Sequence, residues 1–376
     1  MLPAIPGTFG RLSDVFVSSL GSITGTDNRL SFRGSKRVIA ILVDGLGSQN
    51  LKAAGGHAPF LNAALAKSKN IACGFPSTTA TSIASFATGV PGGQHGLVGY
   101  KVYDRASAKS FNLLNGWDAS HDASQWQRAT TVTSRALDAG VGAFSIGPKA
   151  YEGSDYTRAT MAGASYLPGK SIADRFDAAI NLLHRERGDF LAYLYVPELD
   201  QVGHAQGVAS DRWLQELEDL DSQVRRLAGA LGKGDSVVLT ADHGVLDIPA
   251  HAQVYLDEIS TTWEAVADVS GDPRVNFVYL EEETALDRVR QDLQEGIGDR
   301  GLALTRTQVL EAGWYGPTHE ETLARLPDIF VLATKNVAFY HRGYAPAASL
   351  NMIGQHGALS SVEMSIPLIG WGGYAA

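Results

Sequence analysis

Short, uninterrupted apolar runs are the feature of this sequence that most limits its fold. They are five to seven residues long, rich in β-branched and aromatic residues, and do not alternate between apolar and polar positions. This pattern is typical of parallel strands that are covered on both faces. The strand-like runs are Arg37–Val43, Phe190–Val196, Ser236–Thr240 and Ile329–Ala333, with a weaker one at Gly142–Ile146.

Segments with helical periodicity lie between these runs. The clearest extends from Ser210 to Leu231, where apolar residues recur every three or four positions opposite a charged face. Ser210 is a residue type that often caps the start of a helix. Strands that alternate with helices predict an α/β fold, with an open, mostly parallel sheet sandwiched between helices.

The alternation changes after Asp247. The following segment holds one strand-like run, Asn276–Leu280, and a charged helix from Ala285 to Gly296. We therefore predict a small inserted α/β cap over residues 251–325. The rest of the chain then divides into an N-terminal extension packed on the core (residues 1–36) and the core itself (residues 37–250 and 326–376).

The composition of the chain limits the kinds of molecule that it is expected to bind and the compartment in which it is expected to act. The 376 residues carry 31 Lys and Arg against 40 Asp and Glu, a formal charge of −9, and no long basic run, so polymeric nucleic acid is an unexpected partner. A signal peptide and a membrane-spanning run are not evident, and the chain is expected to act without a membrane. The single cysteine, Cys73, favours a reducing compartment, so we expect a cytoplasmic location. The oligomeric state stays open.

Acidic residues and histidines follow the strand-like runs. In an open α/β sheet, ligands bind at the carboxyl ends of the strands, where residues distant in sequence meet. A single Asp at such a place is more often a turn or helix-capping residue, but here acid and histidine recur beside glycine after three different runs. Carboxylates and imidazoles together suit two divalent metal ions, and zinc, manganese and iron all fit this ligand set. The candidate ligands are Asp44, Asp200, His204, Asp242, His243 and His356.

A hydroxyl-rich segment, Gly74–Gly89, supplies a candidate nucleophile. It reads as a turn at Pro76 followed by a helix that ends at Gly89. The start of a helix favours an anion, and a coordinated metal lowers the pKa of a threonine hydroxyl. The hydroxyls could instead be only helix caps. The remaining histidines His121, His184, His319 and His341 lie in polar or charged contexts, and we expect them at the surface.

Three other enzyme classes lack their motifs. Ala143-Phe-Ser-Ile-Gly147 misses the first glycine of an α/β-hydrolase nucleophile turn. Gly45-Leu-Gly-Ser-Gln-Asn50 misses the last glycine of a dinucleotide-binding motif, and Gly232-Lys-Gly-Asp-Ser236 is not a phosphate-binding Walker loop. A non-enzymatic, metal-stabilised binding module stays open as an alternative, although a purely structural site would have a closed ligand set.

In order along the chain, several motifs resemble those of the alkaline phosphatase superfamily, most closely its nucleotide pyrophosphatase/phosphodiesterase family. The resemblance covers residues 37 to 371, apart from the segment 251–325. It rests on Val43-Asp-Gly45, Phe75-Pro-Ser-Thr-Thr79, Thr88-Gly89 with His95-Gly96, Asp200-x-x-x-His204, Thr240-Ala-Asp-His-Gly244 and His356-Gly357.

The resemblance implies an alkaline phosphatase-like core and roles for individual residues. Thr79 would be the nucleophile that forms a covalent phosphothreonine. One metal ion would be held by Asp200, His204 and His356, and the other by Asp44, Asp242, His243 and the Thr79 oxygen. At the spacing where the family commonly has a phosphate-binding Asn this chain has Tyr100, so Tyr100 or Lys101 is expected to contact the substrate instead.

The expected reaction is hydrolysis of a small phosphoester. A phosphomonoester carries more charge than a diester, and a monoesterase usually supplies an additional cation such as arginine. The motifs contain no arginine, and Lys101 and Arg105 are the nearest cations. We therefore predict a phosphodiesterase or nucleotide pyrophosphatase, with a phosphomonoesterase as the alternative.

Overall fold

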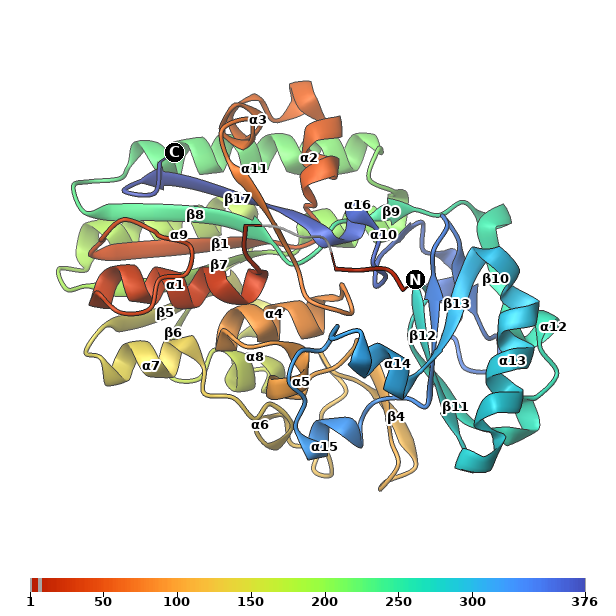
Figure 1. Cartoon of the computed structure of the whole chain (residues 1–376). Helices are drawn as coiled ribbons and strands as arrows, with labels where there is room; N and C mark the ends of the chain where they lie inside the picture. Colours follow the sequence, from red (N-terminus) through yellow and green to blue (C-terminus); the bar gives the residue numbers. More distant parts are fainter. Residues whose placement is uncertain (1, 6–8, 376) are drawn as a thin grey trace.

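The computed structural model describes residues 2–5 and 9–375, and its largest element is a seven-stranded sheet (Figure 1). The strand order is β2-β17-β8-β1-β7-β5-β6, and β17 alone runs antiparallel to its neighbours. The predicted α/β fold with a mostly parallel sheet is confirmed. The strands are β1 (Arg37–Val43), β2 (Lys69–Ala72), β5 (Gly142–Pro148), β6 (Ser165–Gly169), β7 (Phe190–Val196), β8 (Asp235–Ala241) and β17 (Ser365–Gly372).

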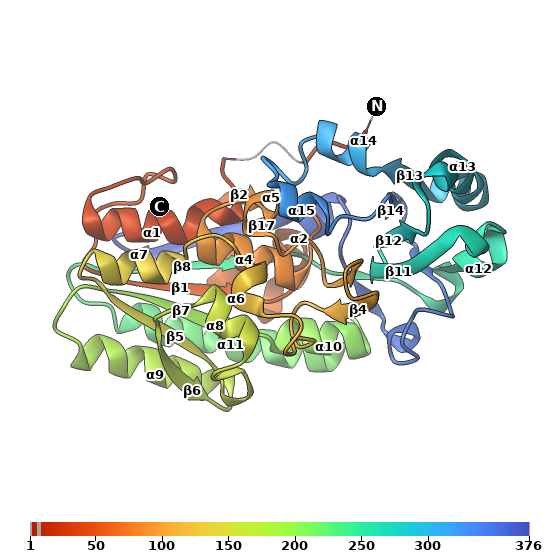
Figure 2. The same cartoon turned by 90° about the horizontal axis from the view of Figure 1, so that it is seen from below.

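Helices cover both faces of this sheet (Figures 1 and 2). The predicted helix after Ser210 is confirmed as α11, and the Ser210 side chain accepts a hydrogen bond from the Trp213 amide at its start. One face carries α1 (Leu12–Thr24), α4 (Thr79–Thr88), α7 (Val132–Asp138) and α8 (Asp155–Thr160), with the short α5 (Gly92–His95) and α6 (Ala123–Trp126) nearby. The other carries α2 (Ser48–Ala53), α3 (Pro59–Leu65), α9 (Ile172–Arg185), α10 (Glu198–Gln206) and α11 (Asp211–Gly229).

A second, four-stranded antiparallel sheet lies beside the first, with α13 packed on it (Figure 1). Its order is β11-β12-β14-β13. The predicted strand Asn276–Leu280 and the charged helix after it are confirmed as β12 and α13. The elements are β11 (Val266–Asp272), β12 (Val275–Leu280), β13 (Gly301–Thr305), β14 (Ile329–Ala333), α12 (Leu256–Ile259), α13 (Leu286–Ile297), α14 (Arg306–Glu311) and α15 (Glu320–Leu323).

The assignment of Ile329–Ala333 to the core sheet was wrong. This run is β14, which lies between β12 and β13 and is antiparallel to both. Its alternate residues belong to two different hydrophobic clusters: Phe330 and Leu332 join the large core, whereas Val331 joins the core of the second sheet. A strand buried on both faces has an uninterrupted apolar sequence whatever its direction, so the pattern could not separate the two cases.

Three pairs of short strands complete the fold. The antiparallel pair of β9 and β16 brings the segment before His356 against the segment after His243. The predicted cap ended at residue 325, but the second sheet continues beyond it, since the sheet includes β14 and β15 follows on the same side. In other respects the division into an N-terminal extension, a core and a cap stays a prediction. The pairs are β3 (Lys101–Asp104) with β4 (Lys109–Asn112), β9 (Leu246–Asp247) with β16 (Gly354–Gln355), and β10 (Gln253–Tyr255) with β15 (Ala338–Tyr340).

The N-terminal helix α1 is part of the large core. Leu12, Val15 and Phe16 are fully buried, and the Phe16 ring stacks on Phe86 of α4 with the ring centroids 4.6 Å apart. Within residues 2–5 and 9–375, none of the helices has the length and apolar character needed to cross a membrane.

One expectation about surface histidines was also wrong. His121 is 2% exposed and packs against Phe111, with the ring centroids 4.1 Å apart. Its ring nitrogens contact Asp118 at 3.0 Å and Asp104 at 3.3 Å. Polar neighbours in the sequence therefore did not indicate exposure here, because they are the hydrogen-bond partners that allow burial of the ring.

A buried ion pair joins the two sheets. Arg274, in the turn between β11 and β12, is 1% exposed, and its Nε and Nη2 atoms donate to both carboxylate oxygens of Glu363 at 3.1 and 2.9 Å. Glu363 lies in the short helix α16 (Ser361–Met364) and also accepts a hydrogen bond from the Ala358 amide. The Arg274 Nη1 atom donates to the carbonyls of Lys335 and Val337. The two bonds to Glu363 therefore link the second sheet to the core, and the two bonds to carbonyls hold the guanidinium against the segment that follows β14.

Removing one partner of this pair should destabilise the protein more than removing both. We expect Arg274→Met to lower the free energy of unfolding by roughly 3–5 kcal/mol, because Glu363 is left as an uncompensated buried charge. The double variant Arg274→Met/Glu363→Gln should recover part of this loss. Urea denaturation of the two variants and the parent measures the difference, and equal losses in the single and double variants would contradict the explanation.

Candidate active site

The predicted metal ligands lie at one edge of the core sheet. Strand β1 pairs in parallel with β7 and β8, and Val43 is the partner of both Val196 and Ala241. Because the three strands end at the same level, the segments that follow them begin side by side. Asp44 follows β1, Asp200 and His204 lie on α10 after β7, and Asp242 and His243 follow β8.

Gly45 allows the first two of these segments to approach each other. Its φ is +73°, and a Cβ atom there would lie 3.2 Å from the Asp200 Cβ and 3.0 Å from the Val245 side chain. A larger residue would be strained and would push Asp44 away from Asp200. The Asp-Gly pair found in the sequence is therefore a requirement of the close packing.

Thr79 is the hydroxyl residue that faces the acidic cluster. It is the first residue of α4, and its Oγ1 lies 3.2 Å from His243 Nε2 and 3.4 Å from Asp44 Oδ1. Ser77 instead donates to the Ala358 carbonyl, and Thr78 points toward Asp272 at 3.5 Å. Only Thr79 of these three is placed to attack a group bound among the acidic residues.

The three histidines present the same ring nitrogen to the cluster. In each ring Nδ1 faces a backbone carbonyl: Gly354 for His204 at 2.7 Å, Ser77 for His356 at 2.8 Å, and Gly244 for His243 at 3.3 Å. A carbonyl only accepts hydrogen bonds, so Nδ1 carries a proton in each ring, and Nε2 is the nitrogen that each ring offers to a metal ion when it is neutral. The Nε2 atoms of His204 and His356 are 3.3 Å apart, as expected for nitrogens that converge on a shared ion.

The carboxylates form a site with a high density of negative charge. Burial raises the pKa of Asp44 well above its usual value, and the charges of Asp242 and Asp200 raise it further. Burial also raises the pKa of Asp242 to about 7. Some donors are present: the Gly45 and His243 amides donate to Asp242 Oδ1, and the Tyr195 hydroxyl donates to Asp44.

The histidines respond to these charges in different ways. Burial lowers the pKa of His204, but the neighbouring carboxylate of Asp200 outweighs it and raises the pKa to about 9. Burial lowers the pKa of His243 to about 3 and that of His356 well below its usual value. His243 and His356 are therefore neutral at physiological pH, which is the form that binds a metal ion.

These residues fit a pair of divalent cations. Asp200, His204 and His356 offer ligand atoms within 4.8 Å of one another, and so do Asp44, Asp200 and His243. Asp200 Oδ1 and Asp242 Oδ2 are buried without a hydrogen-bond partner, as expected for oxygens that would bind an ion. Asp242 Oδ2 lies 3.5 Å from His243 Nε2, so all of the predicted ligands come together, while their role as ligands stays a prediction.

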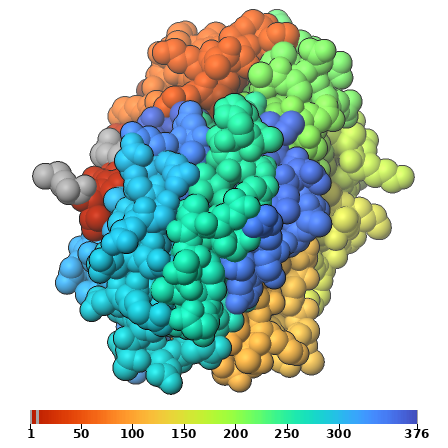
Figure 3. All heavy atoms as spheres, turned by 90° about the vertical axis from the view of Figure 1, so that its right-hand side faces the viewer, coloured from red at the N-terminus to blue at the C-terminus, as the bar shows by residue number. Residues whose placement is uncertain are grey.

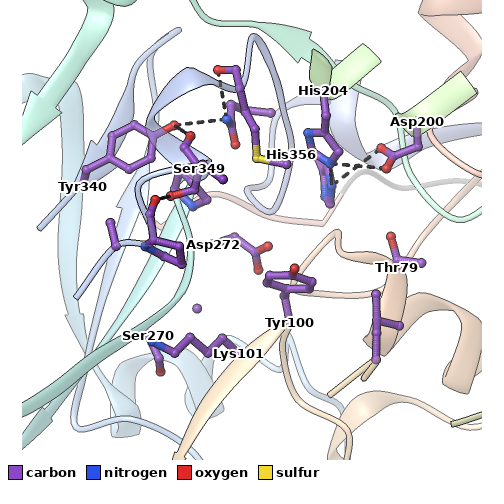
Figure 4. A pocket seen from close by; sticks show the side chains of 18 of the residues that line it. Thr79, Tyr100, Lys101, Asp200, His204, Ser270, Asp272, Tyr340, Ser349 and His356 are labelled. Carbon is purple, nitrogen blue, oxygen red and sulfur yellow. Dashed lines mark hydrogen bonds and ion pairs between the residues drawn. The ribbon is translucent and has the colours of Figure 1, made fainter. Parts of the chain in front are cut away.

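A cavity of about 400 Å³ opens in front of the cluster (Figure 4). The predicted substrate contacts Tyr100 and Lys101 both line it, together with Thr79, Asp200 and residues of the second sheet. Tyr100 is 38% exposed and Lys101 begins β3. The cavity therefore lies between the nucleophile side and the second sheet.

Sequence reasoning missed two polar residues of this site. Tyr195 lies within the apolar run of β7, where the sequence predicts that an aromatic residue belongs to the hydrophobic core. Its hydroxyl nevertheless donates a hydrogen bond to Asp44. Asp272 ends β11 and lines the cavity, but Gly271-Asp-Pro273 reads as an ordinary turn and has no histidine beside it. The hydroxyl of a tyrosine near the end of an otherwise apolar strand was the one available signal for Tyr195. For Asp272 the sequence contains none.

The fold and the cluster together define an α/β protein with a candidate dinuclear metal site and a threonine at a helix start. The sequence profile of the family described as "Type I phosphodiesterase / nucleotide pyrophosphatase" matches residues 38–359, and the chain belongs to this family. No curated protein matches the chain at a significant level.

Solved structures of a related mammalian protein have the same fold. Murine ectonucleotide pyrophosphatase/phosphodiesterase 5, as an inactive variant in complex with AMP, is 19% identical with a TM-score of 0.71, and the match covers 90% of this chain and 88% of that chain. The human protein of the same name is 18% identical with a TM-score of 0.69, over 89% of this chain and 88% of that chain.

Because Asp200 belongs to both groups of ligand atoms, its loss should affect both ions. We expect the protein to bind two zinc or manganese ions per chain, to melt at a lower temperature after chelation and to regain stability on reloading. Asp200→Asn should weaken both binding events, whereas His204→Gln should weaken one. Metal analysis after dialysis and calorimetric titration measure this, and retention of two tight sites in Asp200→Asn would contradict the arrangement.

Proposed function

We propose that the protein hydrolyses phosphodiesters or nucleotide pyrophosphates through a covalent phosphothreonine on Thr79. The observation that carries the proposal is the position of the Thr79 hydroxyl, which contacts Asp44 and His243 within a buried Asp and His cluster and also lines the cavity. A non-enzymatic binding module would have no need of a nucleophile at this point.

Thr79 is oriented for attack on phosphorus by its own neighbours. Its hydroxyl is directed at Asp44 Oδ1, which is positioned to accept the proton. The Thr79 oxygen would then form a bond to phosphorus as the bond to the leaving alkoxide breaks, and water would later hydrolyse the phosphothreonine to release the monoester product. The start of α4 directs free amide hydrogens toward the same place, which favours the negative phosphoryl group.

Two divalent cations, held by the residues described above, would supply positive charge that activates the threonine oxygen and stabilises the transferred group. The metal used in the cell is open, and zinc is our first expectation because both groups combine carboxylates with imidazole nitrogens. His243 and His356 are already neutral with the proton on Nδ1, whereas His204 would release its second proton when an ion binds.

The space around the site suits a substrate with two ester groups. A second cavity of about 390 Å³ shares Leu114, Tyr151 and Tyr195 with the first. It is lined mostly by apolar and aromatic side chains, including Tyr156 and Trp117, which would accept the second group of a diester. The related murine structure that contains AMP supports a small nucleotide as one class of ligand.

The charges of the first cavity also favour a diester. Within the described part of the chain, Lys101 is the one lysine or arginine among the residues that line it. A phosphomonoester would require more positive charge than this to hold its additional oxygen. Lys101 is also the residue that would support the phosphomonoesterase alternative.

A comparison of two chromogenic substrates tests the proposed function. We expect kcat/KM for bis(p-nitrophenyl) phosphate to exceed that for p-nitrophenyl phosphate, because the cavities provide room for a second ester group and little additional positive charge. Both are measured with the same zinc- or manganese-loaded protein. A higher value for the monoester would favour the alternative, and the absence of both activities would refute a hydrolase.

Replacement of the two adjacent threonines tests the nucleophile. Thr79→Ala should reduce turnover of bis(p-nitrophenyl) phosphate by at least roughly 10³-fold, because the attacking oxygen is removed. Thr78→Ala is the matched control and should have a much smaller effect, since its hydroxyl points toward Asp272. Circular dichroism and metal content establish that both variants fold. An active Thr79 variant beside an inactive Thr78 variant would reverse the assignment.

A further inference from the structure

Asp272 is a carboxylate that the second sheet contributes to the cavity. It is the last residue of β11 and is 7% exposed. Figure 4 shows its carboxylate in the cavity between Tyr100 and His356. It belongs to neither group of converging metal-ligand atoms. The cluster described above therefore does not account for this residue.

The hydrogen bonds within the protein leave Asp272 incomplete. The Thr78 hydroxyl, 3.5 Å from Oδ1, and the Tyr100 backbone amide are the donors directed at its carboxylate, while its buried Oδ2 has no hydrogen-bond partner. Among residues 2–5 and 9–375 it makes no ion pair with lysine or arginine. Arg274 is two residues away, but its guanidinium is bound to Glu363 and two carbonyls. A buried carboxylate oxygen without a donor is costly, so a ligand that donates to it would gain stability.

Asp268 provides a useful contrast on the same strand. It is also 7% exposed, but its carboxylate accepts a hydrogen bond from the Ser110 hydroxyl and does not line the cavity. Of the two buried aspartates of β11, Asp268 faces other protein groups and has a hydrogen-bond partner. Asp272 faces the cavity, and its Oδ2 has none.

The chemistry of the cavity limits what could bind Asp272. Burial raises the pKa of Asp272 to about 7, and a cationic ligand beside it would favour the ionised form. The ionised carboxylate repels a phosphate oxygen, so it would face the alcohol part of an ester. A protonated primary amine offers three N–H donors and a positive charge. Tyr100, Tyr340 and Tyr344 also line the cavity, and aromatic rings attract a cation.

We propose that Asp272 is a specificity-determining residue that binds a protonated primary amine on an ester group of the substrate. The preferred substrate is then a phosphodiester of an amino alcohol, in which the negative phosphate lies at the Asp and His cluster and the positive amine reaches the adjacent Asp272. The position of the phosphate in this inference rests on the proposed function. The contact between the amine and Asp272 does not depend on it.

Binding of two matched phosphodiesters tests the assignment without turnover. Isothermal titration calorimetry of the metal-loaded Thr79→Ala protein, which lacks the proposed nucleophile, compares bis(2-aminoethyl) phosphate with dipropyl phosphate, which has the same chain length and no charge on its arms. Because both arms are equal, the contact forms whichever ester group lies near Asp272. We expect the amine to bind at least about tenfold more tightly, in line with a charge-assisted hydrogen bond.

Two variants locate the preference. Asp272→Asn should bring the ratio of the two dissociation constants close to one, whereas Asp268→Asn, the control with the same change in charge on the same strand, should leave it as in the parent. Asp272→Ser provides the same comparison if the amide variant does not fold. Metal content is measured for each protein.

Specific outcomes would overturn the inference. An unchanged ratio in Asp272→Asn and Asp272→Ser would do so, as would an equal loss of preference in Asp268→Asn. Bis(2-hydroxyethyl) phosphate that binds as tightly as the amine would show that a neutral donor is sufficient. These results are independent of the hydrolysis assay, so a protein that prefers the amine but cleaves no diester would refute the proposed function and not this contact.

Discussion

Repulsion between buried carboxylates is the constraint on which the rest of the site depends. Parallel pairing of β1 with β7 and β8 places Asp44, Asp200 and Asp242 at one sheet edge, where burial and their mutual charges raise the pKa of Asp44. Backbone amides, the Tyr195 hydroxyl and the proton of His204 offset part of this repulsion. Bound cations would complete the compensation, so the strand register and the proposed metal-binding chemistry are consequences of the same arrangement.

The cluster was predictable because it follows from strand ends, which are readable in the sequence. Runs such as Phe190–Val196 are continuous and short, and the acid or histidine after each one is placed by the register of a parallel sheet. In the sequence, Thr79 could be chosen over Thr78 as the nucleophile only from its position in the motif Phe75-Pro-Ser-Thr-Thr79. The structure adds an independent reason, since the start of α4 turns the two hydroxyls in different directions.

The second sheet was the part that local patterns described least well. Strand β14 is buried on both faces and so resembles a parallel core strand, and Asp272 reaches the site from an antiparallel strand that no motif marks. Both depend on how the second sheet packs against the first, and the contacts that fix this packing, such as Arg274 with Glu363, join residues 89 positions apart. Local sequence carries little information about such distant pairs.

The shared core of the two sheets has a consequence for how ligands enter and leave. Phe330 of the second sheet packs against two other aromatic rings. Its ring centroid is 5.2 Å from that of Phe277, in the same sheet, and 6.2 Å from that of Phe75, in the segment before Thr79. A hinge motion that separated the sheets would have to expose these rings and break the buried ion pair. Access must therefore depend on smaller motions at the cavity mouth, where the segment after β15 lies beside the second sheet on the outer face (Figure 3). Side-chain and loop motions of this kind are faster than domain opening, so a bound ligand could leave the cavity without a slow rearrangement of the fold.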